Sequence, residues 1–249
     1  MSGHSKWSSI KHKKAAQDAK RGKIFTKLIR EITVAARAGG GDPGGNPRLR
    51  AAIQTARGQN MPMDTINRAV TKGAGGTDGD SYEEVIYEGF GPGNVAVVIR
   101  TLTDNRNRTI AAIRTAFNKF NGTLAAANAV QHMFDRKGVL VIPKSAVDEE
   151  TLTEWILEAG AEDLEVGEEE YLVTCSVEEF EEVKAALEAR ELALESAELA
   201  LLPTMRVEIG NREEAEKVLN FLDMLEDEDD VQQVFSNFDI PPEILAELA

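Results

Sequence analysis

Basic side chains crowd the first third of the sequence in a pattern that suits binding to a phosphate backbone. Lysine and arginine neutralise phosphates, and aromatic rings placed among them can stack on exposed bases. Arginine also offers a planar fork that matches a phosphate group. The candidate nucleic-acid-binding residues are Lys6, Trp7, Lys11, His12, Lys13, Lys14, Lys20, Arg21, Lys23, Lys27, Arg30, Arg37, Arg48, Arg50, Arg57, Arg68 and Lys72.

Charge is divided unevenly along the chain, which has a formal net charge of −15. Residues 1–76 contain 15 lysines and arginines against four acids, a net of +11, whereas the remaining residues carry −26. This asymmetry is typical of a basic module on an acidic body, the module binding a polyanion. We expect the two to be separate surfaces. The alternatives are a solvated helix face with a frayed tail, or a basic arm that docks on the acidic body of another copy.

A second group of arginines occurs in the segment DNRNRT, residues 104–109. The segment is expected to open a helix that Asp104 can cap, with Arg106 and Arg108 in its first turn. The helix dipole disfavours cations there, and a helix N-terminus also attracts anions. Arg106 and Arg108 therefore form a candidate secondary anion site, and exposed arginines without a ligand are the alternative.

No pattern in the sequence predicts an enzyme, a metal site or a cofactor site. A single cysteine, Cys175, and three histidines leave little material for a thiolate or histidine metal site. The acidic run 223–230 lacks the glycine and glutamate spacing of a calcium loop, and we interpret it as a solvated helix end. The loop GGGDPGG lacks the GK[ST] of a phosphate-binding P-loop. The segment GFGPGN has the G-x-G spacing of a dinucleotide-binding motif, but it leads into a strand rather than a helix and is interpreted as a hairpin turn. We therefore predict no catalytic residues, no metal, no cofactor and no small-molecule substrate.

Hydropathy gives no sign of a membrane protein. No run of 18 apolar residues occurs, and the N-terminus lacks the apolar core of a secretory signal. We expect a cytoplasmic protein without membrane contact, although a basic, acid-poor start would also suit import into a mitochondrion. An oligomer is compatible with the sequence.

The basic region is predicted to be helical. Apolar residues recur at three- and four-residue steps between residues 19 and 38, with basic residues on a separate arc. Asn46 and Pro47 are a capping residue and a first-turn proline for a second helix ending at about Arg57. Pro62 is expected to open a third helix that Gly73 stops. A glycine-rich linker at 72–81 then marks the end of a small helical domain, 1–76.

Beyond the linker the pattern changes to alternating strands and helices. Strands are predicted at 85–88, 95–101, 122–127, 138–142, 171–176, 198–202, 205–209 and 231–235, and helices at 105–120, 148–159, 177–190 and 212–225. The order from residue 138 to about residue 203 indicates a β-α-β-β-α-β, or ferredoxin-like, unit.

The predicted fold class is α+β multidomain, with an N-terminal small helical domain followed by two α/β (ferredoxin-like) domains. Residues 79–130 and 204–249 are expected to form a discontinuous domain into which 131–203 is inserted. A linear division into two domains is the alternative.

Several long motifs resemble the YebC family, which includes the mitochondrial translational activator of cytochrome c oxidase. They are SGHSKWSSIKHKKAAQDAKRGKIFTKLIREI, ARAGGGDPGGNPRLRAAIQTAR, NMPMDTINRAVTKG, YEGFGPGN and DNRNRT, and the resemblance covers essentially the whole chain. It implies three domains and a protein that is not an enzyme. The matched residues in the basic segment are His4, Lys6, Trp7, Lys11, Lys13, Lys14, Lys20, Arg21, Lys23, Lys27 and Arg30.

The resemblance implies two functions. Bacterial members of the family are generally described as probable transcriptional regulators that bind promoter DNA, and we expect this chain to bind DNA through its basic N-terminal domain. The competing description is a translation factor on the ribosome, in contact with ribosomal RNA, that relieves stalling, for example at proline runs. A basic tail containing Trp7, without a clear helix-turn-helix, suits irregular RNA as well as a major groove.

Overall fold

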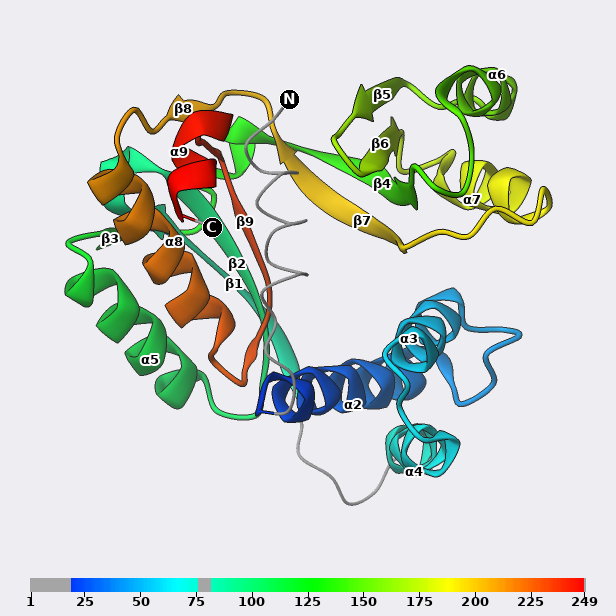
Figure 1. The fold of residues 1–249 in the computed structure, drawn as a ribbon. Helices are drawn as coiled ribbons and strands as arrows, with labels where there is room; N and C mark the ends of the chain where they lie inside the picture. The colour runs from blue at the N-terminus through cyan, green and yellow to red at the C-terminus, as the bar shows by residue number, and fades with distance from the viewer. Residues whose placement is uncertain (1–18, 76–81, 249) are drawn as a thin grey trace.

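The fold is assembled from a bundle of three helices and two four-stranded sheets (Figure 1). The computed structural model describes residues 19–75 and 82–248, with side chains described from residue 22 onward. The predicted α+β class, with a helical N-terminal region followed by α/β domains, is confirmed.

The helical module, residues 19–75, is built on one long helix. Its helices are α2 (Ala19–Gly39), α3 (Pro47–Gly58) and α4 (Met63–Ala74). The apolar cluster that joins them includes Ile32, Leu49 and Ile66, which are fully buried. Asn46 caps α3 by accepting from the Leu49 amide at 3.1 Å, and its side-chain amide donates to the Ala35 carbonyl at 2.8 Å. The glycine-rich loop is therefore tied to the end of α2 and connects two helices.

The expectation that Gly73 ends the third helix is wrong. Helix α4 continues through Gly73 to Ala74, with Gly75 as its C-cap. Gly73 is buried against α2, where a β-carbon would lie 2.4 Å from the Thr33 carbonyl oxygen and 2.7 Å from the Ala36 β-carbon. The glycine is needed for close helix packing rather than for a turn.

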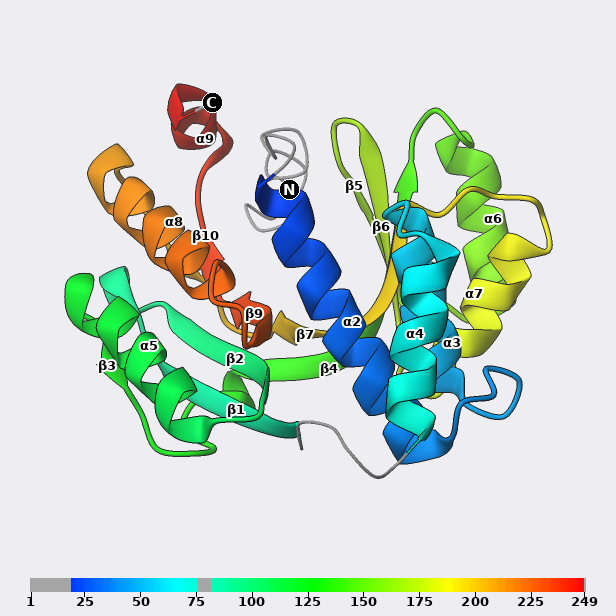
Figure 2. The same ribbon diagram turned by 90° about the horizontal axis from the view of Figure 1, so that it is seen from below.

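The first sheet has the antiparallel strand order β3-β1-β2-β9. Its strands are β1 (Glu83–Phe90), β2 (Ala96–Thr103), β3 (Thr123–Leu124) and β9 (Val231–Ser236). Helices α5 (Arg106–Lys119) and α8 (Arg212–Glu226) cover one face (Figure 2). Val97 and Ile99 of β2 pack there with Phe117 of α5 and Phe221 of α8. Strand β9 therefore joins a sheet whose other strands come from more than a hundred residues earlier.

Small elements complete this part of the chain. They are the short helices η1 (Pro92–Asn94) and η2 (Gln131–Met133), the parallel pair β8 (Val207–Glu208) and β10 (Phe238–Asp239), and helix α9 (Pro242–Leu248).

The second sheet has the strand order β5-β6-β4-β7, all antiparallel. Its elements are β4 (Phe134–Pro143), α6 (Glu149–Ala159), β5 (Asp163–Val166), β6 (Glu170–Cys175), α7 (Phe180–Glu188) and β7 (Ser196–Pro203). This order confirms the ferredoxin-like unit. Leu140, Ile156 and Val173 form its core with Cys175, and burial raises the pKa of the Cys175 thiol to about 11. The thiol is therefore protonated at neutral pH.

Several element boundaries differ from the prediction. The strand expected at 122–127 is reduced to Thr123–Leu124, because Asn121 and Asn128 take left-handed backbone conformations on either side. Helix α7 begins at Phe180 rather than 177, after a turn in which the Ser176 hydroxyl accepts from the Glu179 amide at 3.1 Å. The predicted β-α-β-β-α-β order requires a strand between residues 159 and 171, but the sequence pattern assigned no residues to it, and the structure places β5 there. Strand β10 and helix α9 were not predicted.

Gly73→Ala tests the close packing of α4 on α2. Alanine normally stabilises a helix relative to glycine, by up to about 1 kcal/mol. At Gly73 we expect a loss of about 1–3 kcal/mol in the free energy of unfolding, because the new methyl group overlaps α2. The control is Gly22→Ala on α2, where no atom lies within 4 Å of a β-carbon and a small gain is expected. A gain for both variants in urea unfolding would contradict the packing argument.

Candidate nucleic-acid interface

The structure locates part of the predicted basic surface. Lys6, Trp7, Lys11, His12, Lys13 and Lys14 lie outside the described residues, as do the side chains of Lys20 and Arg21. The candidates it places on the helical module are Lys23, Lys27, Arg30, Arg37, Arg48, Arg50, Arg57, Arg68 and Lys72. These cations form two groups. The held cations form hydrogen bonds or ion pairs with carboxylates and carbonyls of other elements, and the exposed cations lie on the surface of the module.

The first held group lies on α2 and meets the C-terminal end of α8. Residues 226–230, EDEDD, form this contact and are called the acidic turn. Lys23 Nζ lies 3.2 Å from Asp227 Oδ1, and Lys27 Nζ donates to the Glu226 carbonyl at 2.6 Å. Because a helix C-terminus carries partial negative charge, both lysines lie where a cation is favoured.

Arg30 binds the most buried carboxylate of the acidic turn. Its guanidinium donates to the Asp229 carbonyl and to Asp230 Oδ1, the latter at 2.8 Å. The Asp230 side chain is only 7% exposed, and it also accepts from Arg108 Nη2 at 2.8 Å and from the Thr109 hydroxyl at 2.8 Å. One carboxylate thus joins α2, α5 and the start of β9.

The carboxylates of the acidic turn repel one another. Burial raises the pKa of Glu228, and the neighbouring Asp229 and Asp230 raise it further, whereas Lys23 lowers it. The cations of α2 therefore offset a concentration of negative charge that would be unfavourable without them.

Arg48 belongs to a second held group, which links α2 and α3 to the first sheet. Arg48 Nε donates to Glu31 at 2.6 Å, and this hydrogen bond raises the Arg48 pKa. Arg100 of β2 lies 3.6 Å from Glu31, and Arg48 lies 3.4 Å from Glu84 of β1. Arg100 was not among the candidate residues.

Arg106 and Arg108 lie in the first turn of α5 as predicted, but each forms an ion pair with a carboxylate. Arg106 Nε is 2.7 Å from Glu83, and Arg108 Nη2 is 2.7 Å from Asp104. The hydrogen bond from Arg108 holds the pKa of Asp104 below its usual range. The expected cap is wrong, because Asn105 rather than Asp104 accepts the amide hydrogen of Arg108.

The other candidates are exposed near the end of α2 and along α3 and α4. They are Arg37, Arg50, Arg57, Arg68 and Lys72. Arg50 donates to the carbonyls of Pro43 and Gly44, which leaves its charge unneutralised. Within the described ranges, Arg50, Arg57 and Arg68 form no ion pair with a carboxylate.

The expected separation of basic and acidic surfaces is therefore wrong for Lys23, Lys27 and Arg30. Steps of four and three residues place these cations on one face of α2, and their charge attracts the acidic turn about 200 residues later. The sequence contained this signal, since a short acidic run at a helix end complements a row of cations. We interpreted the run as solvated instead.

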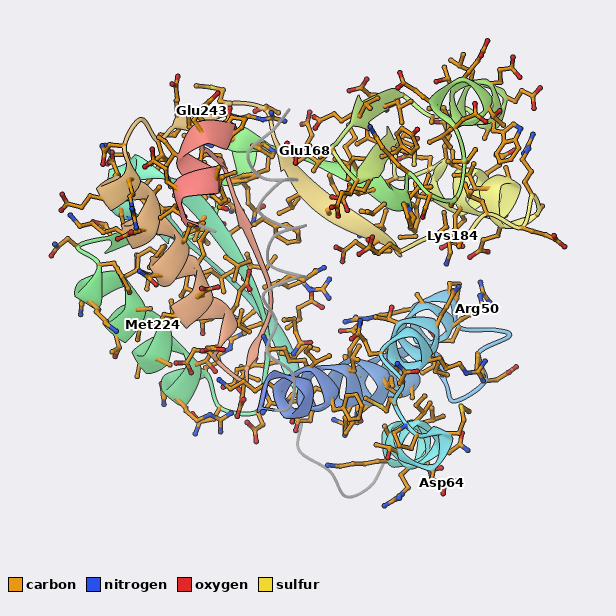
Figure 3. All side chains as sticks on the ribbon, viewed as in Figure 1. Arg50, Asp64, Glu168, Lys184, Met224 and Glu243 are labelled. Atoms are coloured by element: carbon orange, nitrogen blue, oxygen red, sulfur yellow. The ribbon has the colours of Figure 1, made fainter. Side chains whose placement is uncertain are left out.

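A third contact joins the helical module to the second sheet's helices. Gln54 of α3 accepts from Lys184 Nζ of α7 at 3.0 Å and donates to Glu188 at 3.2 Å. Figure 3 shows Arg50 on α3 and Lys184 on α7 in these neighbouring parts of the structure. This contact is also polar and exposed.

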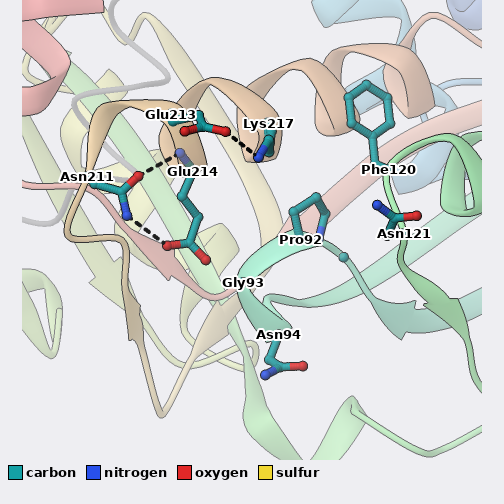
Figure 4. A pocket seen from close by; sticks show the side chains of 10 residues that line it. Pro92, Gly93, Asn94, Phe120, Asn121, Asn211, Glu213, Glu214 and Lys217 are labelled. Carbon is teal, nitrogen blue, oxygen red and sulfur yellow. Dashed lines mark hydrogen bonds and ion pairs between the residues drawn. The ribbon is translucent and has the colours of Figure 1, made fainter.

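A polar pocket of about 480 Å³ lies at the other end of the first sheet, between η1, the end of α5 and the start of α8 (Figure 4). Its acidic side chains already have partners. Glu213 pairs with Lys217 at 2.7 Å, and Asn211 donates to Glu214 at 3.2 Å. The lining therefore offers no unpaired catalytic group.

No helix in the described ranges, 19–75 and 82–248, has the length and apolar character needed to cross a membrane. The histidine, cysteine and acidic side chains of these ranges form no group of three or more that could hold a metal ion.

Two family models match the chain in adjoining segments. The TACO1/YebC protein N-terminal domain matches residues 5–76, and the TACO1/YebC second and third domain matches residues 82–238. The matches together include the helical module and both sheets.

Similar proteins extend over nearly the full length of this chain. A probable transcriptional regulatory protein of Geobacter sulfurreducens is 54% identical over 248 residues and is covered completely. One from Geotalea uraniireducens is 55% identical over 243 residues, 98% of each chain. The crystal structure of a conserved hypothetical protein from Aquifex aeolicus has 50% identity and a TM-score of 0.86, covering 93% of this chain and 96% of that one.

Asp230→Asn tests whether this carboxylate holds the module to the body. We expect the free energy of unfolding to fall by about 3 kcal/mol, because Arg30 and Arg108 lose their shared buried anion. Asp229→Asn is the matched control, since Asp229 contacts Arg30 through its backbone carbonyl and should change stability by less than about 0.5 kcal/mol. Equal losses for the two variants in urea unfolding would contradict the assignment.

Proposed function

Because the chain belongs to the TACO1/YebC family, we propose that it is a non-enzymatic regulator of gene expression that binds nucleic acid through its basic N-terminal region. DNA is the first candidate, since the similar bacterial proteins are named probable transcriptional regulatory proteins. In this proposal the basic tail and the helical module bind the phosphate backbone together. Arg106 and Arg108 form a secondary contact in this proposal, where phosphate must compete with Glu83 and Asp104 for the two guanidinium groups.

The observation that supports this proposal most strongly is the exposed positive charge of α3 and α4. Arg50, Arg57 and Arg68 form no ion pair with carboxylates of the described residues, although the chain beyond residue 76 carries −26. Charges left unpaired on such an acidic protein are available to an external anion. The acidic body repels phosphate and so restricts the contact to one side of the molecule.

The arrangement of α3 and α4 favours ribosomal RNA as the second candidate. In Figure 1 both helices are viewed nearly along their axes, so the two axes run in similar directions, and the helices lie apart from each other, each packed on α2. In a helix-turn-helix the two helices cross, so that one of them enters the major groove. Two helices with similar directions, both packed on α2, instead present a broad basic surface, which suits the irregular shape of folded RNA. The protein would then act as a translation factor on the ribosome.

Replacing the three exposed arginines tests the proposed surface. If about five phosphates are neutralised, the logarithm of the duplex DNA binding constant should fall with the logarithm of salt concentration with a slope of about −4 to −5. In Arg50→Gln/Arg57→Gln/Arg68→Gln the slope should flatten by about 2–3, since each lost phosphate contact removes about 0.9. Fluorescence anisotropy titrations at several salt concentrations measure the slope.

The control variant is Arg206→Gln/Arg212→Gln/Lys217→Gln, which removes the same charge from the acidic body. Its slope should equal that of the unmodified protein, and equal slopes for both triple variants would contradict the proposed surface. Sedimentation with ribosomes separates the two nucleic acids. Retention on ribosomes together with weak duplex binding would favour the translation factor.

A further inference from the structure

The contact between α2 and the acidic turn places the same kind of atoms around Lys23, Lys27 and Arg30 that a nucleic acid would. The lysines and Arg30 bind carbonyl and carboxylate oxygens at the negative end of α8. From this geometry we infer that the acidic turn competes with nucleic-acid phosphates for these three cations. The inference rests on the proposed function, and it adds an autoinhibitory contact to the same surface.

Opening this contact has different consequences for its two sides. If Arg30 leaves, the Asp230 carboxylate still accepts from Arg108 Nε at 3.1 Å and from the Thr109 hydroxyl at 2.8 Å. The buried anion therefore keeps hydrogen-bond partners on the body. Arg30, by contrast, loses its carboxylate and needs a new anion, which a phosphate supplies.

The interface around this contact is polar and lacks a shared apolar core. The apolar cluster of the helical module contains residues of α2, α3 and α4 together with Met61 between α3 and α4, and no described residue of the body. Other described links to the body include the Glu31–Arg100 and Arg48–Glu84 ion pairs, the hydrogen bonds of Gln54, and the Arg30 guanidinium 5.7 Å from the centroid of the Tyr82 ring. Contacts of this kind are individually weak and are screened by salt, so motion of the module relative to the body is expected.

The held and exposed cations lie on the same rigid module. Arg50, Arg57 and Arg68 can bind phosphate while the acidic turn still holds α2. Phosphate bound there raises the local concentration of phosphate near Lys23, Lys27 and Arg30, because a nucleic acid is a continuous chain of anions. When phosphates displace the acidic turn, they gain contacts with Lys23, Lys27 and Arg30. The free energy needed to separate the acidic turn from α2 lowers the apparent affinity of the protein for the nucleic acid.

The test compares two variants that remove the same charge from opposite ends of α8. Asp227→Asn/Asp229→Asn weakens the acidic turn without touching the buried Asp230. Glu213→Gln/Glu216→Gln is the matched control, because these residues pair only with Lys217 and Arg212 at the start of α8 in the described chain. Both variants and the unmodified protein are titrated with duplex DNA and with an RNA hairpin of similar length. Thermal unfolding first establishes that all three are folded.

We expect the acidic-turn variant to bind about two- to fivefold more tightly than the control variant, as loss of the exposed Lys23–Asp227 ion pair permits. Equal affinities of the two variants would overturn the competition and leave the proposed function in place. Absence of binding by all three proteins to both probes would overturn the proposed function and the competition with it.

Discussion

The structure depends on the buried carboxylate of Asp230. Asp230 directly precedes β9, and its carboxylate binds Arg30 of α2 and Arg108 of α5 at 2.8 Å each. A carboxylate that is 7% exposed must be paired, so its two arginines fix the helical module and α5 against the same corner of the first sheet. The other ion pairs between the module and the body involve side chains that are more exposed than Asp230.

The division of charge connects this corner to function. The helical module, residues 19–75, has 11 lysines and arginines against three acids, a net of +8, whereas residues 77–249 carry −26, and this difference favours contact between the module and the body. Only part of the positive charge is used, because the acidic turn contacts one face of α2 and Arg48 pairs with Glu84, while Arg50, Arg57 and Arg68 form no ion pair with a described carboxylate. The same basic residues thus serve both assembly of the protein and the proposed binding of nucleic acid.

Local sequence patterns predicted the elements well where apolar residues have a clear period. Helix α8 begins at the expected Arg212 and ends one residue later than expected, because its buried residues recur at helical spacing. Strand β5, with the sequence DLEV, has only two apolar residues, and pairing with β6 rather than its own pattern makes it a strand. Gly73 was misread because only the position of α2 shows why a side chain cannot fit.

The candidate site was harder to predict, because the partners of its cations lie far away in the sequence. The most direct measurement is the distance between spin labels on Ala51→Cys of α3 and Asn220→Cys of α8, both exposed positions, while the buried Cys175 stays unlabelled. If phosphates displace the acidic turn from α2, adding duplex DNA or the RNA hairpin should shift the distances to longer values. Binding of either nucleic acid at an unchanged distance would contradict the account.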